Sequence, residues 1–165
     1  LANGGGRRWR GLDLELLYAF EPAGLGPIDR VRISALHTVA VEVRRIDPDT
    51  GAESVREGLL NDPRHRSMVS ASVDIGPASL GVFLQRRGKA RSSELDIDAA
   101  GIPAVTTADI ALGYVLSDRI SATIGVKNLT DRDAPIFPFA DVADTAPQYY
   151  DIRGRRYAFG VSASF

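Results

Sequence analysis

Two carboxylates placed two positions apart come closest, in this sequence, to a catalytic arrangement. Asp13 and Glu15 fall on the same side of an alternating segment, and on a strand their Cα atoms would be about 6.5 to 7 Å apart. A pair of carboxylates within reach of one substrate is the machinery of a glycoside hydrolase. The same side chains are also what the water-facing side of a strand carries, and we favour that interpretation. We expect no enzymatic activity and no cofactor.

Other residue types that could do chemistry are few. The sequence has no Cys, which excludes thiolate metal sites, disulfides and a cysteine nucleophile. His37 and His65 have no further metal ligand nearby in the sequence. The glycines at positions 4 to 6, followed by Arg7 and Arg8, would cradle a phosphate only ahead of a helix. Here they precede a strand, so we expect a loop.

Two segments hold the candidate contacts for a bound molecule. The basic residues stand at the end of an alternating segment: Arg86, Arg87, Lys89 and Arg91. The aromatic residues lie in a long connection: Phe137, Phe139, Tyr149 and Tyr150. The cations could meet an anionic ligand or lipopolysaccharide phosphates, or simply form a solvated strand end. The rings could stack on a ligand or belong to an interfacial girdle.

Seven segments with apolar residues at every second position must position these side chains. They are residues 12–20, 31–44, 69–75, 80–85, 108–116, 120–127 and 156–165. Strict alternation indicates strands. The alternation places Val39, Val41 and Val43 on the same apolar face as His37. The sequence therefore predicts an all-β chain, an antiparallel up-and-down meander of about seven long strands.

The connections indicate what kind of meander this is. Those at residues 21–27, 76–78 and 117–119 are short, whereas those at 47–63, 92–103 and 131–150 are long. Short turns at one end and long loops at the other are typical of outer-membrane barrels. Several strands also approach the roughly 9 to 11 residues that cross a bilayer at a tilt. We therefore predict part of a transmembrane β-barrel, with a soluble ligand-binding β-barrel or sandwich as the alternative.

The composition and the hydropathy limit the partners and the kind of membrane protein that the chain could represent. The 165 residues include 20 Lys and Arg and 21 Asp and Glu, for a net charge of -1, so nothing indicates a nucleic-acid partner. No apolar run reaches the roughly 18 to 20 residues of a membrane-spanning helix. The first residues do not resemble a signal peptide, and Leu1 is not Met. We expect residues 1–165 to be the C-terminal part of a longer barrel.

Three stretches carry a resemblance to TonB-dependent outer-membrane receptors. Residues 125–131 read GVKNLTD, similar to a GxKNLxD pattern of that family, and residues 150–155 read YDIRGR, similar to its YxxxGR pattern. Residues 10–15, RGLDLE, are similar to an RGxExE strand start, with Asp13 where Glu is more usual. The chain also ends in Phe165, as these receptors do. The motif residues are Gly125, Lys127, Asn128, Leu129, Asp131, Gly154 and Arg155.

The resemblance implies a function. Members of this family sit in the bacterial cell outer membrane, have a barrel of about 22 strands around a plug, and take up scarce solutes, most often ferric siderophores, with energy delivered through the TonB complex. It implies outer-membrane lipid and the barrel-assembly machinery as partners. The assembly signal would be Tyr157, Phe159, Val161 and Phe165, which could equally be only lipid-facing. An N-terminal plug region would carry the TonB contact. The sequon at Asn128 is expected to form a strand-end turn.

Overall fold

The computed structural model describes residues 5–24, 26–92, 101–136 and 145–164. Phe165, Phe137, Phe139 and Gly4 lie outside these described residues. Seven long strands follow one another in a single antiparallel sheet, each paired with the next along the chain. They are β1 (Gly6–Phe20), β2 (Arg30–Ile46), β4 (His65–Ile75), β5 (Ala78–Arg87), β8 (Val105–Ser117), β9 (Ile120–Lys127) and β10 (Arg156–Ala163). The predicted antiparallel up-and-down meander is confirmed.

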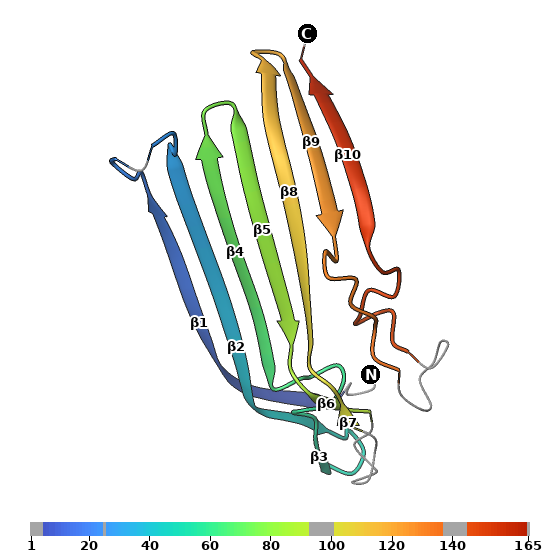
Figure 1. The fold of residues 1–165 in the computed structure, drawn as a ribbon. Helices are drawn as coiled ribbons and strands as arrows, with labels where there is room; N and C mark the ends of the chain where they lie inside the picture. The colour runs from blue at the N-terminus through green and yellow to red at the C-terminus, as the bar shows by residue number, and fades with distance from the viewer. Residues whose placement is uncertain (1–4, 25, 93–100, 137–144, 165) are drawn as a thin grey trace.

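Three short strands lie outside the meander. β3 (Glu53–Val55) pairs with the end of β2, whereas β6 (Ala90–Arg91) and β7 (Gly101–Ile102) pair with each other. All three belong to the long connections at one end of the sheet (Figure 1). Within the described ranges no helix is long and apolar enough to cross a membrane.

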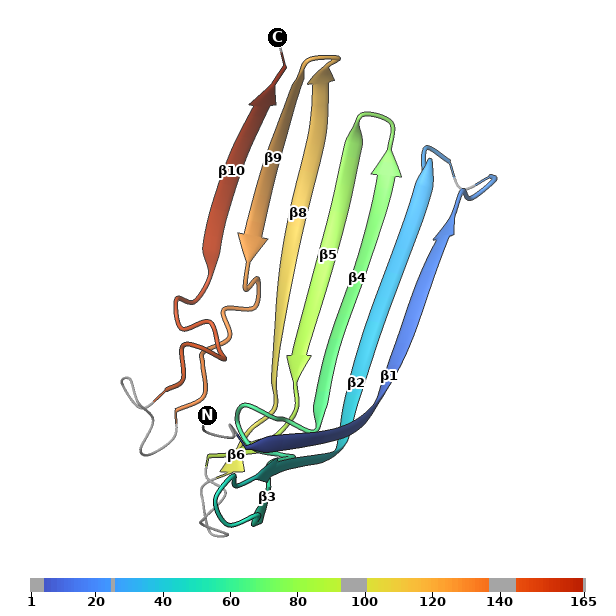
Figure 2. The ribbon, with the colours of Figure 1, turned by 180° about the vertical axis from the view of Figure 1, so that it is seen from behind.

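The two ends of the sheet differ. The connections of residues 21–29, 76–77 and 118–119 are short and lie at the end where the C-terminus is found, as Figures 1 and 2 show. The connections of residues 47–64, 88–104 and 128–155 are long and gather at the opposite end, where β1 also bends across the ends of its neighbours. The predicted alternation of short and long connections is confirmed.

One face of the sheet is apolar from edge to edge, because the pairing aligns the alternating residues of all seven strands. One row of directly opposed residues consists of Tyr18, Ile33, Ala71, Val82, Ile110, Val126 and Tyr157. The next row consists of Phe20, Val31, Val73, Leu80, Leu112, Ile124 and Phe159. We call this surface the apolar face. The opposite, polar face carries Asp13, Thr38, Ser70, Ser72 and many small residues.

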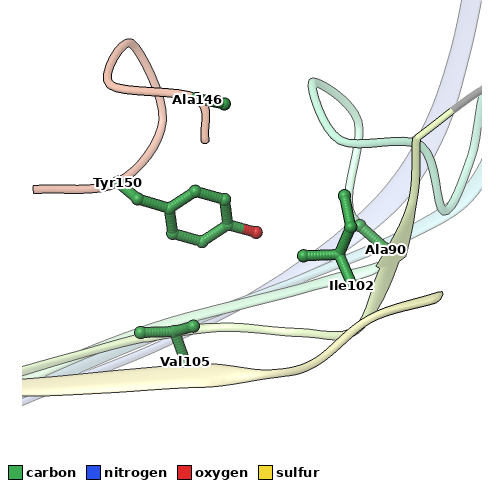
Figure 3. Packing of buried hydrophobic residues seen from close by; sticks show 5 residues of the cluster. All are labelled: Ala90, Ile102, Val105, Ala146 and Tyr150. Carbon is green, nitrogen blue, oxygen red and sulfur yellow. The ribbon is translucent and has the colours of Figure 1, made fainter. Parts of the chain in front are cut away.

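Nothing among the described residues covers the apolar face. Leu16 is 55% exposed, Phe159 79% and Val161 78%. The buried hydrophobic cluster lies instead among the long connections, where Ala90, Ile102, Val105, Ala146 and Tyr150 meet (Figure 3). A sheet in a water-soluble sandwich would bury its apolar face against a second layer. In this chain the buried residues lie where the long connections meet the sheet, and the apolar face of the sheet stays exposed.

A β-bulge in β2 corrects one detail of the sequence analysis. Arg10 is opposite Glu42 and Gly11 is opposite Ala40, so Val41 is an extra residue that has no partner in β1. The bulge places Val43 opposite Trp9, on the polar side, although simple alternation put it with Val39 on the apolar side. A bulge inserts one residue and reverses the alternation that follows. On this side of the sheet Val43 is fully buried, next to the 47–64 connection that hydrogen-bonds its backbone.

Candidate functional site

The first candidate surface is the apolar face, whose edges run diagonally across the strands. Toward the short turns the apolar residues of β1 end at Phe20. In β4 they continue to Ile75, two residues beyond the row that contains Phe20. In β9 they continue to Ile120, four residues beyond the same row. The edge of the apolar face therefore advances by about one residue per strand.

The other edge of the apolar face moves in the same direction. In β1 it lies at Leu12, eight residues before Phe20, whereas in β4 it lies at Val69, four residues before the same row. In β10 it lies at Tyr157, two residues before that row. The two edges stay parallel, and between them lie six to eight residue steps, or about 20 to 27 Å of strand at about 3.4 Å per residue.

A diagonal band is what a flat slab cuts from tilted strands. One residue of about 3.4 Å per strand spacing of about 4.8 Å corresponds to a tilt of about 35°. Strands of outer-membrane barrels tilt by about 35 to 45°, and their apolar band is about 25 Å tall. At a tilt of about 35° the apolar face is about 16 to 22 Å tall, so its tilt is similar to that of such barrels and its height is slightly smaller.

Polar side chains mark where this band ends near the long connections. The row beyond Val69 on the same face consists of His37, Ser67, Arg86 and Thr106. His37 Nδ1 lies 2.8 Å from Ser67 Oγ, and Arg86 donates to Thr106 Oγ1 at 3.0 Å. His37 lies on the apolar face as predicted, and its ring stacks on that of His65 at 5.6 Å between centroids. The histidines therefore stand at the border of the band.

The second candidate site lies on the polar face, beneath the connection of residues 128–155. The Arg87 guanidinium carbon is 5.0 Å from the ring centroid of Tyr149 and 5.7 Å from that of Tyr150. Arg87 also donates to the Leu60 carbonyl at 3.3 Å. A cation that lies over the face of an aromatic ring is attracted to that ring. Arg87 thus joins the ends of three long connections, and three of the predicted ligand contacts are brought together.

Lys89 and Arg91, which we also predicted as contacts, lie elsewhere. Lys89 is exposed. The backbone of Arg91 binds the loop before β4, donating to Gly58 O at 2.8 Å and accepting from Leu60 N at 2.9 Å. Alternation also separates the basic cluster, since Arg86 belongs to the apolar face and Arg87 to the polar face. The four cations therefore do not form one patch.

A cavity of about 270 Å³ opens beside Arg87 and the two tyrosines. Arg66 and Arg132 also line it, together with Asp133 and Asp151. Arg66 and Arg132 were not predicted, because only the strand pairing and the fold of the connection bring them near Arg87. Burial raises the pKa of the Tyr150 hydroxyl, while the charge of Arg87 partly opposes that effect. Tyr150 is therefore neutral at physiological pH.

The motif residues at the start of the 128–155 connection form a closed turn. Asn128 is 3% exposed and has a φ of 52°. Its side-chain amide donates to Arg132 O at 2.9 Å and accepts from Arg132 N at 2.9 Å. Its backbone N–H donates to Asp109 Oδ1 at 2.8 Å. The expected strand-end turn at Asn128 is confirmed.

The second half of the motif fastens the end of the same connection. Asp131 also has a φ of 52°, and its Oδ1 accepts from Arg155 N at 2.8 Å. A Cβ placed on Gly154 would come within 3.2 Å of that oxygen. Lys127 lies opposite Arg156, and Gly125 lies opposite Ala158. Leu129 donates its N–H to Ala108 O at 2.6 Å. In this structure the hydrogen bond between Asp131 and Arg155 holds the two ends of the 128–155 connection together.

Two other carboxylates, those of Asp13 and Glu57, make structural contacts. Asp13 accepts a hydrogen bond from Thr38 Oγ1 at 2.6 Å, and Glu15 lies exposed on the same polar face. Glu57 is buried in the 47–64 connection and accepts from Val43 N at 3.1 Å. Burial acts to raise the pKa of Glu57, but the backbone hydrogen bonds and the charges of nearby arginines outweigh it and leave that pKa below its usual value.

No protein-family model matches this sequence, and a comparison with curated proteins finds no match. The similarity to TonB-dependent receptors therefore rests on the sequence patterns alone.

Proposed function

We propose that this chain forms part of the wall of a bacterial outer-membrane β-barrel that takes up a scarce solute in a TonB-dependent manner, with ferric siderophores as the first solutes to test. The observation that carries the wall assignment is the diagonal apolar band. The TonB-dependent activity rests on the motif resemblance around Asn128 and Gly154. The chemistry is binding and gating, and no bond is made or broken.

The size of the apolar face favours lipid over water as its neighbour. Seven strands at about 4.8 Å spacing give a width of about 30 Å. With a height of about 20 Å, the projected area is on the order of 600 Å². This area is at the upper end of the about 300 to 600 Å² that the largest apolar patch of a typical water-soluble monomer covers. This estimate counts only the seven strands of this chain, so the complete surface would be larger.

The two sheet edges fit the same proposal. Within the described residues β1 pairs only with β2, and β10 pairs only with β9. Unpaired strand edges are unfavourable in a bilayer, where no water can satisfy the backbone. We propose that further strands of the same barrel pair with both edges.

The last strand also supports a role in barrel assembly. Tyr157, Phe159 and Val161 project from the apolar face of β10 and are strongly exposed. Phe165, the fourth residue of the predicted signal, lies outside the described residues. An exposed aromatic and aliphatic row on the final strand would present a readable surface to the assembly machinery before lipid covers it.

Labelling of single introduced cysteines tests the wall assignment. These 165 residues contain no native Cys that would react with the label. Ala111 and Leu112 are adjacent in β8 and belong to opposite faces. We expect Ala111→Cys in cell envelopes to react with a water-soluble maleimide. A fluorophore on Leu112→Cys should instead be quenched by a lipid-borne spin label. Lack of quenching at Leu112 would reject the membrane wall and favour a soluble β-module.

Transport needs a separate test. Cells that lack the gene should lose growth on one ferric siderophore as the sole iron source, and a TonB deletion should have the same effect. Uptake that persists without TonB would contradict the coupling, although the wall assignment would stand. Oligosaccharides, haem and cobalamin are the next solutes to test.

A further inference from the structure

We infer that the cavity beside Arg87 is a binding site for an oxyanion, such as a carboxylate or phosphate group carried by the solute. The inference deepens the proposed function by naming the charge of the solute, and it rests on that function only for the claim that the solute passes this site. Its basis is a pair of arginines that the fold brings together without a carboxylate to neutralise them.

Arg66 and Arg87 are directly opposite each other in the pairing of β4 with β5. The other neighbours in this row are Thr38 beside Arg66 and Val105 beside Arg87. Like charges directly opposite on a sheet destabilise it. The nearest carboxylate along the row, Asp13, lies beyond Thr38 and is hydrogen-bonded to it. The row therefore holds two uncompensated positive charges.

Within the described part of the chain the two arginines bind only backbone carbonyls and aromatic rings. Arg66 donates to Asn61 O at 2.7 Å, and Arg87 donates to Leu60 O at 3.3 Å. The Nε atom of Arg87 is buried and has no hydrogen-bond partner among the described residues. A buried charged donor without a partner is costly, so the site gains stability when an anion approaches.

The carboxylates that line the cavity do not supply that compensation. Asp151 is already paired with Arg153 and Arg156. Asp133 is exposed and faces a cavity that Arg132 also lines. The cavity therefore keeps an excess of positive charge beside two tyrosine rings. Planar guanidinium groups suit carboxylate and phosphate oxygens, with which they form charge-assisted hydrogen bonds.

The size of the cavity indicates what part of a solute it takes. Sites for complete small ligands occupy about 300 to 1,000 Å³, and this one measures about 270 Å³. It therefore fits one charged group of a larger solute. Its place on the polar face, at the end of the sheet with the long connections, lets the rest of the solute extend along that face.

Calorimetric titration of the detergent-purified protein with inorganic phosphate, and separately with citrate, tests this inference. We expect saturable binding of at least one anion by the wild type. Arg66→Gln should weaken that binding at least about tenfold, or about 1.4 kcal/mol. In the absence of anion the same variant should be as stable as the wild type or more stable, because one like charge is removed. Arg87→Gln should also lose binding, but Arg87 additionally holds the loops.

Lys89→Gln is the matched control, since it removes one exposed positive charge close in sequence but outside the cavity lining. It should leave anion binding unchanged. The inference is overturned if the wild type binds neither anion, if Arg66→Gln binds as well as the wild type, or if Lys89→Gln weakens binding equally. Labelling at Ala111 and Leu112 reports the wall independently, so a failed anion site and a failed barrel assignment give different results.

Discussion

Asn128 offers the sharpest test of how the long 128–155 connection is held, because three contacts and an unusual backbone conformation meet at one buried residue. Its side chain makes two hydrogen bonds to the backbone of Arg132. Its φ of 52° lies in the left-handed region, which Asn adopts more readily than Ala. The backbone N–H bond to Asp109 survives any substitution in which the turn itself survives.

The expected cost of Asn128→Ala follows from these contacts. Each lost side-chain hydrogen bond contributes about 1 kcal/mol, and the buried backbone groups left behind add to that. The left-handed conformation costs Ala about 1 kcal/mol more than Asn. We expect Asn128→Ala to lower the free energy of unfolding by about 3 to 4 kcal/mol. Asn128→Gly loses the same hydrogen bonds without the conformational cost, so a loss of about 2 to 3 kcal/mol is expected.

Urea unfolding in detergent micelles, followed by far-ultraviolet circular dichroism, measures the global effect, and limited proteolysis reports opening of the connection. Thr130→Ala is the control, because Thr130 is exposed in the same turn and should change stability by less than about 0.5 kcal/mol. The order of the variants is decisive. If Ala at position 128 is more stable than Gly, or if both match the wild type, the turn does not fasten the connection.

Three further predictions concern other parts of the chain. Gly11→Ala should destabilise the bulge by about 1 to 3 kcal/mol, because the new Cβ would overlap the Trp9 indole and lie 2.8 Å from Val39 O. Gly160→Ala is the control: its Cβ would meet nothing within 4 Å, so the variant should be nearly neutral in the same urea assay. Phe159→Lys should cost about 2 to 4 kcal/mol in lipid vesicles if it faces lipid, whereas Ser162→Lys on the polar face should cost much less. The pKa of Glu57 is lowered from 4.5 in the folded protein, so its carboxylate stabilises the 47–64 connection above about pH 4.5. This stabilisation is lost as the pH falls through the pKa that Glu57 has in the folded state. A Glu57→Gln variant should lose that acid dependence in a proteolysis assay.

The strands could be predicted from the sequence, because alternation is a local property. The seven segments and the short and long connections between them all appear in the structure. The reversal at Val41 could not be predicted, since a bulge shows only when the partner strand is known. The pairing also determines which residues share a row, so the diagonal band is invisible in the sequence of any single strand.

The candidate site was predicted in part. Arg87, Tyr149 and Tyr150 were identified as contacts by residue type, and the fold brings them together across 62 positions. Arg66 gave no signal in the sequence, because an arginine at the start of a strand is ordinary. Lys89 stood out in the sequence only because it lies near Arg87 along the chain. The motif around Asn128 was recognised as a pattern, but its hydrogen bonds became clear only from the structure.

The stability of this chain has two separate sources, and they explain why a repulsive arginine pair can persist. The sheet is held by its backbone ladders and buries few side chains, since only Ala40, Val43 and Val105 of the long strands are buried hydrophobic residues. The long connections are held by a small hydrophobic cluster and by the turn at Asn128. Arg66 and Arg87 lie where these two systems meet, at the ends of β4 and β5. An anion that neutralises this repulsion would therefore stabilise the fold at the junction of the sheet and the long connections.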